Sequence, residues 1–167
     1  MKTLIVSILL AVSSFTSNAV ADNSNLISRF AYDYEMNDSQ MTSKIVYKVE
    51  DQKFLHPYLK YCYSYDSTGR VSQKDVLKWN QETEKFEKQH CLRFAYNDTD
   101  VTVELISWNA KQQTYSTVKE KSVYQLSDNN TIANYLNYEW NEKDNNWNLV
   151  IQHNTVYDEN EYLLSEK

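Results

Sequence analysis

An aromatic pair with six residues between its two members recurs four times along the chain, and this repeat constrains the fold more than any other feature. The first members of successive pairs lie 32, 29 and 32 residues apart, a period that indicates a repeated supersecondary unit. In the last three pairs an Asn directly follows the first aromatic residue. The pairs are Tyr47 with Phe54, Trp79 with Phe86, Trp108 with Tyr115, and Trp140 with Trp147.

Turn signals between the pairs divide each unit into two strands. These turns are rich in Asp, Asn and Ser, and they lie at residues 66–69, 97–100, 127–130 and 158–160. The segments between them are rich in Tyr, Val, Thr and Trp, which suit a pleated surface better than a helix. Each unit is therefore predicted as strand, turn, strand, turn. The paired aromatic side chains are expected to face each other across a hairpin that the Asn closes.

These hairpins predict an all-β fold, an antiparallel meander of about eight strands built from about four two-strand repeats. The aromatic residues mark one apolar face, while long polar side chains such as Lys74, Lys78 and Glu87 mark an opposite, half-solvated face. The apolar face has to be covered by curling of a single-layer sheet, by pairing or by a partner. A β-sandwich is the alternative fold.

One interval in the repeat has a different length. Val101 and Trp108 are seven steps apart, whereas Val71 and Trp79 are eight steps apart. Because a change of one residue turns every following side chain to the other face of a strand, we expect a β-bulge at residues 102–104.

The first 21 residues are predicted to be a cleaved signal peptide. Lys2 supplies a positive start, residues 4–12 form a short apolar run, and Ala19 and Ala21 give the small-x-small pattern of a cleavage site. Residues 22–167 then form a single β-repeat domain. No Cys lies near the cleavage point to carry a lipid, and no later apolar stretch has membrane length. We therefore expect a soluble exported protein, either periplasmic or extracellular, that is not a lipoprotein.

The charge balance excludes several classes of partner. The chain carries 23 acidic and 17 basic residues, with a formal net charge of −6. Binding to a phosphate backbone needs a basic stripe, so nucleic acid is not expected as a partner. The chain has one glycine, Gly69, which rules out a glycine-rich phosphate cradle. No cofactor is expected.

Cys62 and Cys91 are the two cysteines of the chain, and two interpretations of them stay open. In an oxidising compartment they could form a disulfide. In a simple meander, however, an intervening strand would hold their backbones roughly 10 Å apart, which favours two separate thiols. No close-spaced pair of Cys or His ligands occurs, so no metal site is predicted.

The sequence shows no constellation of catalytic residues. The chain has three His residues scattered along its length, and neither a G-x-S-x-G nor an H-E-x-x-H motif occurs. Close pairs of carboxylates, such as Asp98 with Asp100, are typical of solvated turns in an acidic chain. We therefore expect that the protein is not an enzyme, and a hydrolase is kept as a third hypothesis.

Two resemblances follow from particular residues. The run at residues 63–71, Tyr-Ser-Tyr-Asp-Ser-Thr-Gly-Arg-Val, resembles the core of a YD repeat of the Rhs type. The chain as a whole resembles a family of small secreted proteins of unknown function from gut Bacteroidetes. The residues that carry this second resemblance are the signal start, Tyr65-Asp66, Gly69-Arg70-Val71, the three Trp-Asn pairs and Lys121-Ser122-Val123-Tyr124. It implies export from a Gram-negative envelope and a β-rich domain, and it transfers no active site.

The aromatic pairs support two hypotheses about function. If Trp79, Trp108, Tyr115, Trp140 and Trp147 line an exposed ridge, they can stack on sugar rings as a glycan-binding platform. If the same side chains form the core of the sheet, they only stabilise its hairpins. We predict an exported binding module whose ligand is a glycan or a protein surface. A self-assembling structural protein of the envelope is the alternative.

Overall fold

The computed structural model describes residues 30–51, 53–127 and 132–154, and within them the chain forms ten β-strands and no helix. The strands are β1 (Phe30–Asn37), β2 (Gln40–Glu50), β3 (Phe54–Tyr65), β4 (Val71–Asn80), β5 (Lys85–Tyr96), β6 (Asp100–Asn109), β7 (Thr114–Tyr115), β8 (Glu120–Leu126), β9 (Ile132–Asn141) and β10 (Asn146–Asn154). The predicted signal peptide, most of the predicted turn at 127–130 and the predicted turn at 158–160 lie outside the described residues.

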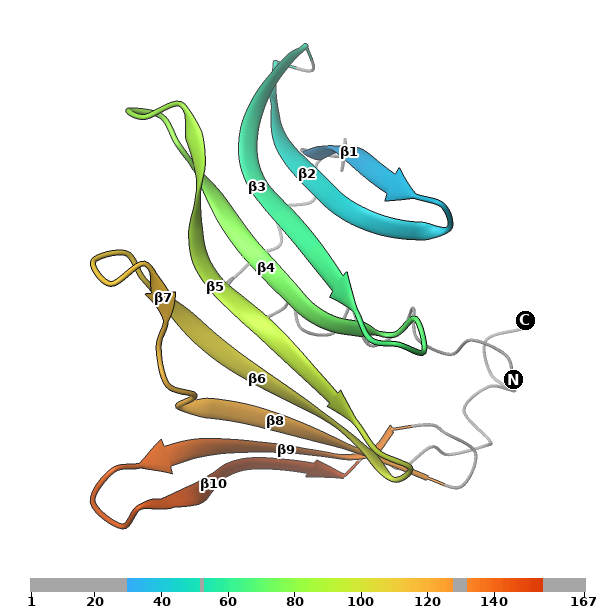
Figure 1. Ribbon diagram of the computed structural model, residues 1–167, viewed down its shortest axis with the longest axis vertical. Coiled ribbons are helices and arrows are strands. Elements are labelled where there is room, and N and C mark those ends of the chain that lie inside the picture. The colour runs from blue at the N-terminus through green and yellow to red at the C-terminus, as the bar shows by residue number, and fades with distance from the viewer. Residues whose placement is uncertain (1–29, 52, 128–131, 155–167) are drawn as a thin grey trace, which may run out of the picture.

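The strands form one antiparallel sheet in the order β1-β2-β3-β4-β5-β6-β8-β9-β10, and β7 pairs with the end of β6. Figure 1 shows that this sheet curls from β1 to β10 without closing into a barrel. The predicted all-β meander is therefore confirmed as a curled single sheet, and the β-sandwich alternative is not formed by the described strands. The count is ten because β1 precedes the repeats and because the predicted strand that begins at Tyr115 is divided into β7 and β8.

The strand ladders contain several register shifts, but not where the sequence predicted one. Shifts occur between β3 and β4 and between β4 and β5, whereas β6 pairs with β5 and β8 without a shift. The bulge expected at residues 102–104 is therefore wrong. An odd interval already points Val101 and Trp108 to opposite faces of a regular strand. Val71 and Trp79 are an even number of residues apart, and a bulge at Ser72 places them on opposite faces as well.

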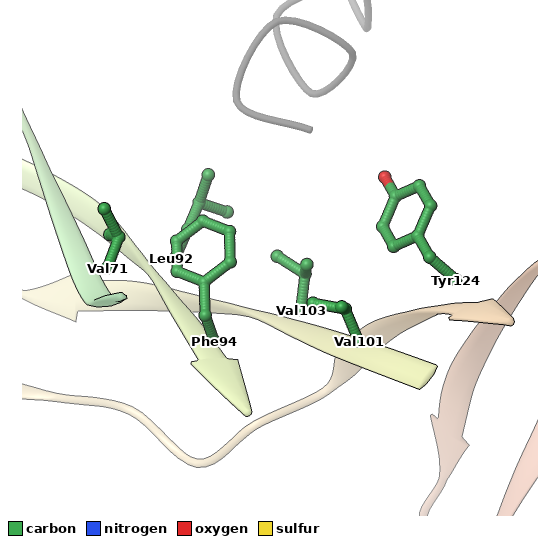
Figure 2. Close-up of a cluster of buried hydrophobic side chains, with 6 residues drawn as sticks. All are labelled: Val71, Leu92, Phe94, Val101, Val103 and Tyr124. Carbon is green, nitrogen blue, oxygen red and sulfur yellow. The ribbon is translucent and has the colours of Figure 1, made fainter. Parts of the chain in front are cut away.

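Both faces of the sheet bury apolar side chains. One face, called the core face below, carries a buried cluster drawn in Figure 2: Val71, Leu92, Phe94, Val101, Val103 and Tyr124. The other, called the tryptophan face, carries the three tryptophan-led pairs. Cys91 and Ile106, which are 0% and 1% exposed, lie opposite each other on this second face. The expectation of a single apolar face is thus wrong, because a bulge on β4 separates Val71 from Trp79 and an odd interval on β6 places Val103 and Ile106 on opposite faces.

Two tyrosine hydroxyls form hydrogen bonds to the backbone of a neighbouring strand. The hydroxyl of Tyr65 donates a hydrogen bond of 2.7 Å to the carbonyl of Met41, and the hydroxyl of Tyr96 donates one of 2.7 Å to the carbonyl of Val71. Each bond joins the end of one strand to the start of its neighbour. A bond of this kind typically contributes about 1 kcal/mol.

The turn after Tyr65 is organised by the carboxylate of Asp66. Its Oδ1 accepts hydrogen bonds from the backbone N–H groups of Thr68 and Arg70, and its Oδ2 accepts one from Nε of Arg70 at 2.8 Å. Gly69 has a φ of +83°, which a residue with a Cβ rarely adopts. The residues of this motif therefore have a structural role in closing the turn.

Candidate aromatic binding surface

Each Trp-Asn pair begins a hairpin loop of the same design. The amide oxygens of Asn80, Asn109 and Asn141 each accept hydrogen bonds from two backbone N–H groups of the following loop. The last residue of each loop has a left-handed backbone, with φ of 51° at Glu84, 53° at Gln113 and 49° at Asn145. The prediction that the Asn closes the hairpin is confirmed for these loops.

The aromatic residues that flank these loops contact each other across the hairpins. The ring centroids are 4.9 Å apart in Trp79 and Phe86, 4.9 Å in Trp108 and Tyr115, and 5.3 Å in Trp140 and Trp147. All three pairs are edge-to-face, a favourable geometry for aromatic rings. The first pair of the repeat does not form, because Phe54 lies opposite Glu50 and a register shift follows Val46.

The three pairs lie on one face and along one side of the sheet. The hairpins β4–β5, β6–β7 and β9–β10 all turn on the left of Figure 1, so the pairs follow one another down that side. The five predicted site residues, Trp79, Trp108, Tyr115, Trp140 and Trp147, are all half-buried. They therefore contribute to the packing of the hairpins and also present part of their surface to solvent.

Two lysine side chains lie over rings of this surface. Nζ of Lys88 is 4.7 Å from the ring centroid of Trp108, and Nζ of Lys121 is 4.4 Å from that of Trp147. At such distances an ammonium group is attracted by the ring face. The lysines hold the rings in place and supply hydrogen-bond donors next to them. No lysine or arginine of the described segments lies over Trp79.

Asp75 stands between the two cysteines on the tryptophan face. It is directly opposite Cys62 on β3 and directly opposite Cys91 on β5. Its Oδ1 accepts hydrogen bonds from the hydroxyl of Tyr115 at 2.8 Å and from Nε2 of Gln73 at 2.7 Å. Tyr115 on β7 thus reaches across β5 to Asp75 on β4. Its side chain covers Cys91, which lies on β5. Burial raises the pKa of the Tyr115 phenol, and its hydrogen bond to Asp75 raises it further.

The possible disulfide between Cys62 and Cys91 is not formed, and both residues are free thiols. The physical reason is that β4 separates the two strands, so the backbones are about two strand spacings apart, roughly 10 Å. Burial raises the pKa of both thiols, so they are protonated at neutral pH and poorly reactive.

We expect iodoacetamide to modify Cys62 slowly and Cys91 not at all in the folded protein. Cys91 is fully buried, whereas Cys62 is half-buried. After unfolding in guanidinium without reductant, both thiols should be modified, as counted by intact-mass spectrometry. A parallel sample with reductant is the control. A chain that is modified only after reduction would show a disulfide and contradict this arrangement.

The three His residues each lie in a different setting. Nε2 of His56 is 2.8 Å from a carboxylate oxygen of Glu50. The ring of His153 stacks on that of Tyr135, and His90 lies opposite Val76 on the core face. Among the residues that the structure describes, no group of three or more His, Cys, Asp or Glu side chains could hold a metal ion. The same residues contain no helix long and apolar enough to cross a membrane.

DUF3836, described as a family of unknown function, has a model that matches residues 1–126. The chain belongs to the DUF3836 family. No curated protein matches the chain.

Solved structures similar to this DUF3836 chain come from Bacteroides and Parabacteroides species. A protein with unknown function from Bacteroides fragilis is 23% identical, covering 75% of this chain and 91% of that chain, with a TM-score of 0.66. A DUF3836 protein from Bacteroides vulgatus is 28% identical over 52% of this chain and 88% of its own, with a TM-score of 0.50. A DUF3836 protein from Parabacteroides distasonis is 20% identical over 57% of this chain and 89% of its own, with a TM-score of 0.53.

Sequence reasoning missed one group of side chains in this DUF3836 chain. Lys44 and Lys74 lie on the core face among tyrosines from β1 and β3. The alternation of residues placed Lys74 on a polar face, but the position of Lys44 beside it depends on strand register. Register is set by the bulges and turns together, so the spacing of these residues along the chain gives no signal for the cluster.

Proposed function

We propose that this DUF3836 chain is an exported, non-enzymatic binding module of the cell envelope, and that its tryptophan face binds a glycan. The observation that carries the proposal is the row of three partly exposed aromatic pairs along one side of one face. Sugar rings present C–H groups that pack on aromatic faces, while their hydroxyls need hydrogen-bond donors and acceptors close by.

The setting of the rings supports this role. Each pair is held by an edge-to-face contact and by a closed hairpin loop, so little side-chain freedom would be lost on binding. Lys88 and Lys121 place amines beside the second and third pairs. The short apolar run at residues 4–12 and the cleavage pattern at Ala19 and Ala21 support export.

The test is isothermal titration calorimetry of the purified protein with neutral oligosaccharides of glucose, mannose and xylose. We expect saturable binding of at least one of them, and a loss of affinity of about tenfold or more in Trp79→Ala and Trp140→Ala. Phe54→Ala is the control, because this ring is 53% exposed but lies outside the three pairs. Absence of binding to every neutral glycan, or an equal loss in the control, would reject the proposal.

A self-assembling structural protein is the second candidate function, and the open edges of the sheet favour it. β1 and β10 are the edge strands of the described sheet, and on β1 the side chains of Tyr32, Tyr34 and Met36 are 48%, 49% and 56% exposed. An open edge strand can pair with another chain. Analytical ultracentrifugation over a range of concentrations distinguishes the two. Reversible assembly without glycan binding would support the structural role.

A further inference from the structure

Lysines and tyrosines alternate across the first four strands of the core face. Tyr34 on β1 lies opposite Lys44 on β2, and Lys44 lies opposite Tyr61 on β3. Tyr63 on β3 lies opposite Lys74 on β4. We call this set, together with Tyr32, the lysine–tyrosine cluster. Its members come from four strands, and only the antiparallel register brings them together.

The amines of the cluster lie over tyrosine rings. Nζ of Lys44 is 4.1 Å from the ring centroid of Tyr32 and 5.5 Å from that of Tyr34. Nζ of Lys74 is 4.1 Å from the ring centroid of Tyr61. Tyr32 and Tyr34 are about half exposed, at 48% and 49%, so a ligand in solution can reach this surface.

No carboxylate of the described residues forms an ion pair with Lys44 or Lys74. This is unusual in a chain whose net charge is −6, because acidic side chains outnumber basic ones. Burial and, to a smaller extent, the charge of Lys44 together lower the pKa of Lys74 to about 8. A half-buried ammonium group without a counter-ion is costly in free energy, so its place in the fold is better explained by a partner that supplies the missing negative charge.

We propose that the lysine–tyrosine cluster binds an acidic oligosaccharide that carries carboxylate or sulfate groups. Lys44 and Lys74 lie on strands separated by β3, about two strand spacings or roughly 10 Å apart, so a chain with several acidic groups can engage both. The acidic groups would make charge-assisted hydrogen bonds with the amines. The exposed rings and hydroxyls of Tyr32 and Tyr34 can contact the sugar rings between them.

This site is separate from the glycan surface proposed above. The two lie on opposite faces of the sheet, and they differ in the ligand they require. Neutral oligosaccharides test the tryptophan face, while acidic ones test the lysine–tyrosine cluster. Failure of one proposal therefore leaves the other standing.

The experiment is calorimetric titration of the purified protein with two acidic probes, oligogalacturonate and heparin-derived oligosaccharide, and with neutral maltooligosaccharide for comparison. We expect an acidic probe to bind and the neutral one not to compete with it. Lys44→Gln and Lys74→Gln should each weaken binding about tenfold, and the double variant more. Lys74→Arg keeps the charge and should retain most of the affinity. If it does, the loss of affinity in Lys74→Gln follows from the lost charge and not from misfolding.

The matched controls are Lys111→Gln and Lys143→Gln, which remove exposed lysines from hairpin loops. If these controls weaken binding as much as the cluster variants, the attraction is diffuse and the site is rejected. Absence of binding to both acidic probes also rejects it, as does equal binding of inorganic sulfate, because a single small anion needs no extended cluster.

The pH dependence gives a second readout. The groups that face Lys74 are Lys44 on β2, Tyr61 and Tyr63 on β3, and His90 on β5. Burial raises the pKa of Tyr61 and raises that of Tyr63 to about 12, and it lowers the pKa of His90. Lys74 is therefore expected to lose its proton as the pH rises from about 7 to about 9, and affinity should fall over that range. An unchanged affinity would exclude Lys74 from the site.

Discussion

Phe94→Ala is expected to lower the free energy of unfolding by about 3–5 kcal/mol. Phe94 lies on β5, near the middle of the sheet, and its side chain is 7% exposed within the buried cluster of the core face. Removing the ring takes away buried apolar contact and leaves a cavity that the neighbouring strands can fill only in part. Urea denaturation followed by circular dichroism measures this change.

Phe54→Ala is the matched control for Phe94→Ala. The ring of Phe54 is 53% exposed at the start of β3, so its removal should cost much less. Equal losses in the two variants would mean that the core face is not the packed interior of the fold. A comparison of the denaturant slopes shows whether either variant changes the cooperativity of unfolding.

Ile106→Ala is expected to lower the free energy of unfolding by about 2–5 kcal/mol. Ile106 is 1% exposed on the tryptophan face, opposite Cys91, so this variant tests the packing of the second face. Thermal denaturation should show a lower midpoint. Tyr115, which crosses β5 to reach Asp75, helps to bury this region, and its hydrogen bond should persist in the variant.

The control for Ile106→Ala is Leu149→Ala on β10. Leu149 is 49% exposed, and its truncation should change stability by well under half as much. If Ile106→Ala were as mild as this control, the tryptophan face would be a surface rather than a second packed layer. A large loss in both Phe94→Ala and Ile106→Ala is the result that a curled single sheet with two buried faces requires.

The local features of the fold could be predicted from the sequence because they depend on residues close together in the chain. The hairpin loops begin at Asn80, Asn109 and Asn141, where a side-chain amide oxygen accepts hydrogen bonds from the backbone N–H groups two and three residues further on. The facing of Trp79 with Phe86 follows from the same short loop. The pairing of Tyr47 with Phe54 failed because a register shift in β2–β3 depends on contacts outside the hairpin loop.

The candidate sites divide in the same way. The aromatic pairs could be located because each lies within one hairpin, although their half-buried state could not. The lysine–tyrosine cluster could not be located, because Tyr34, Lys44, Tyr61 and Lys74 meet only through the register of four strands. The place of Asp75 between Cys62 and Cys91, and the reach of Tyr115 to it, likewise depend on register and on the path of β7.

By itself, then, the sequence determined an all-β meander with closed hairpins and paired aromatics, because short loops and alternating side chains encode those features within a few residues. The tertiary structure alone decided which side chains share a face. A bulge shifts every later residue of a strand by one position, so Val71 and Trp79 end on opposite faces although their spacing suggests one. Whether a shift occurs depends on the packing of neighbouring strands, and this is why the buried second face emerged only with the complete sheet.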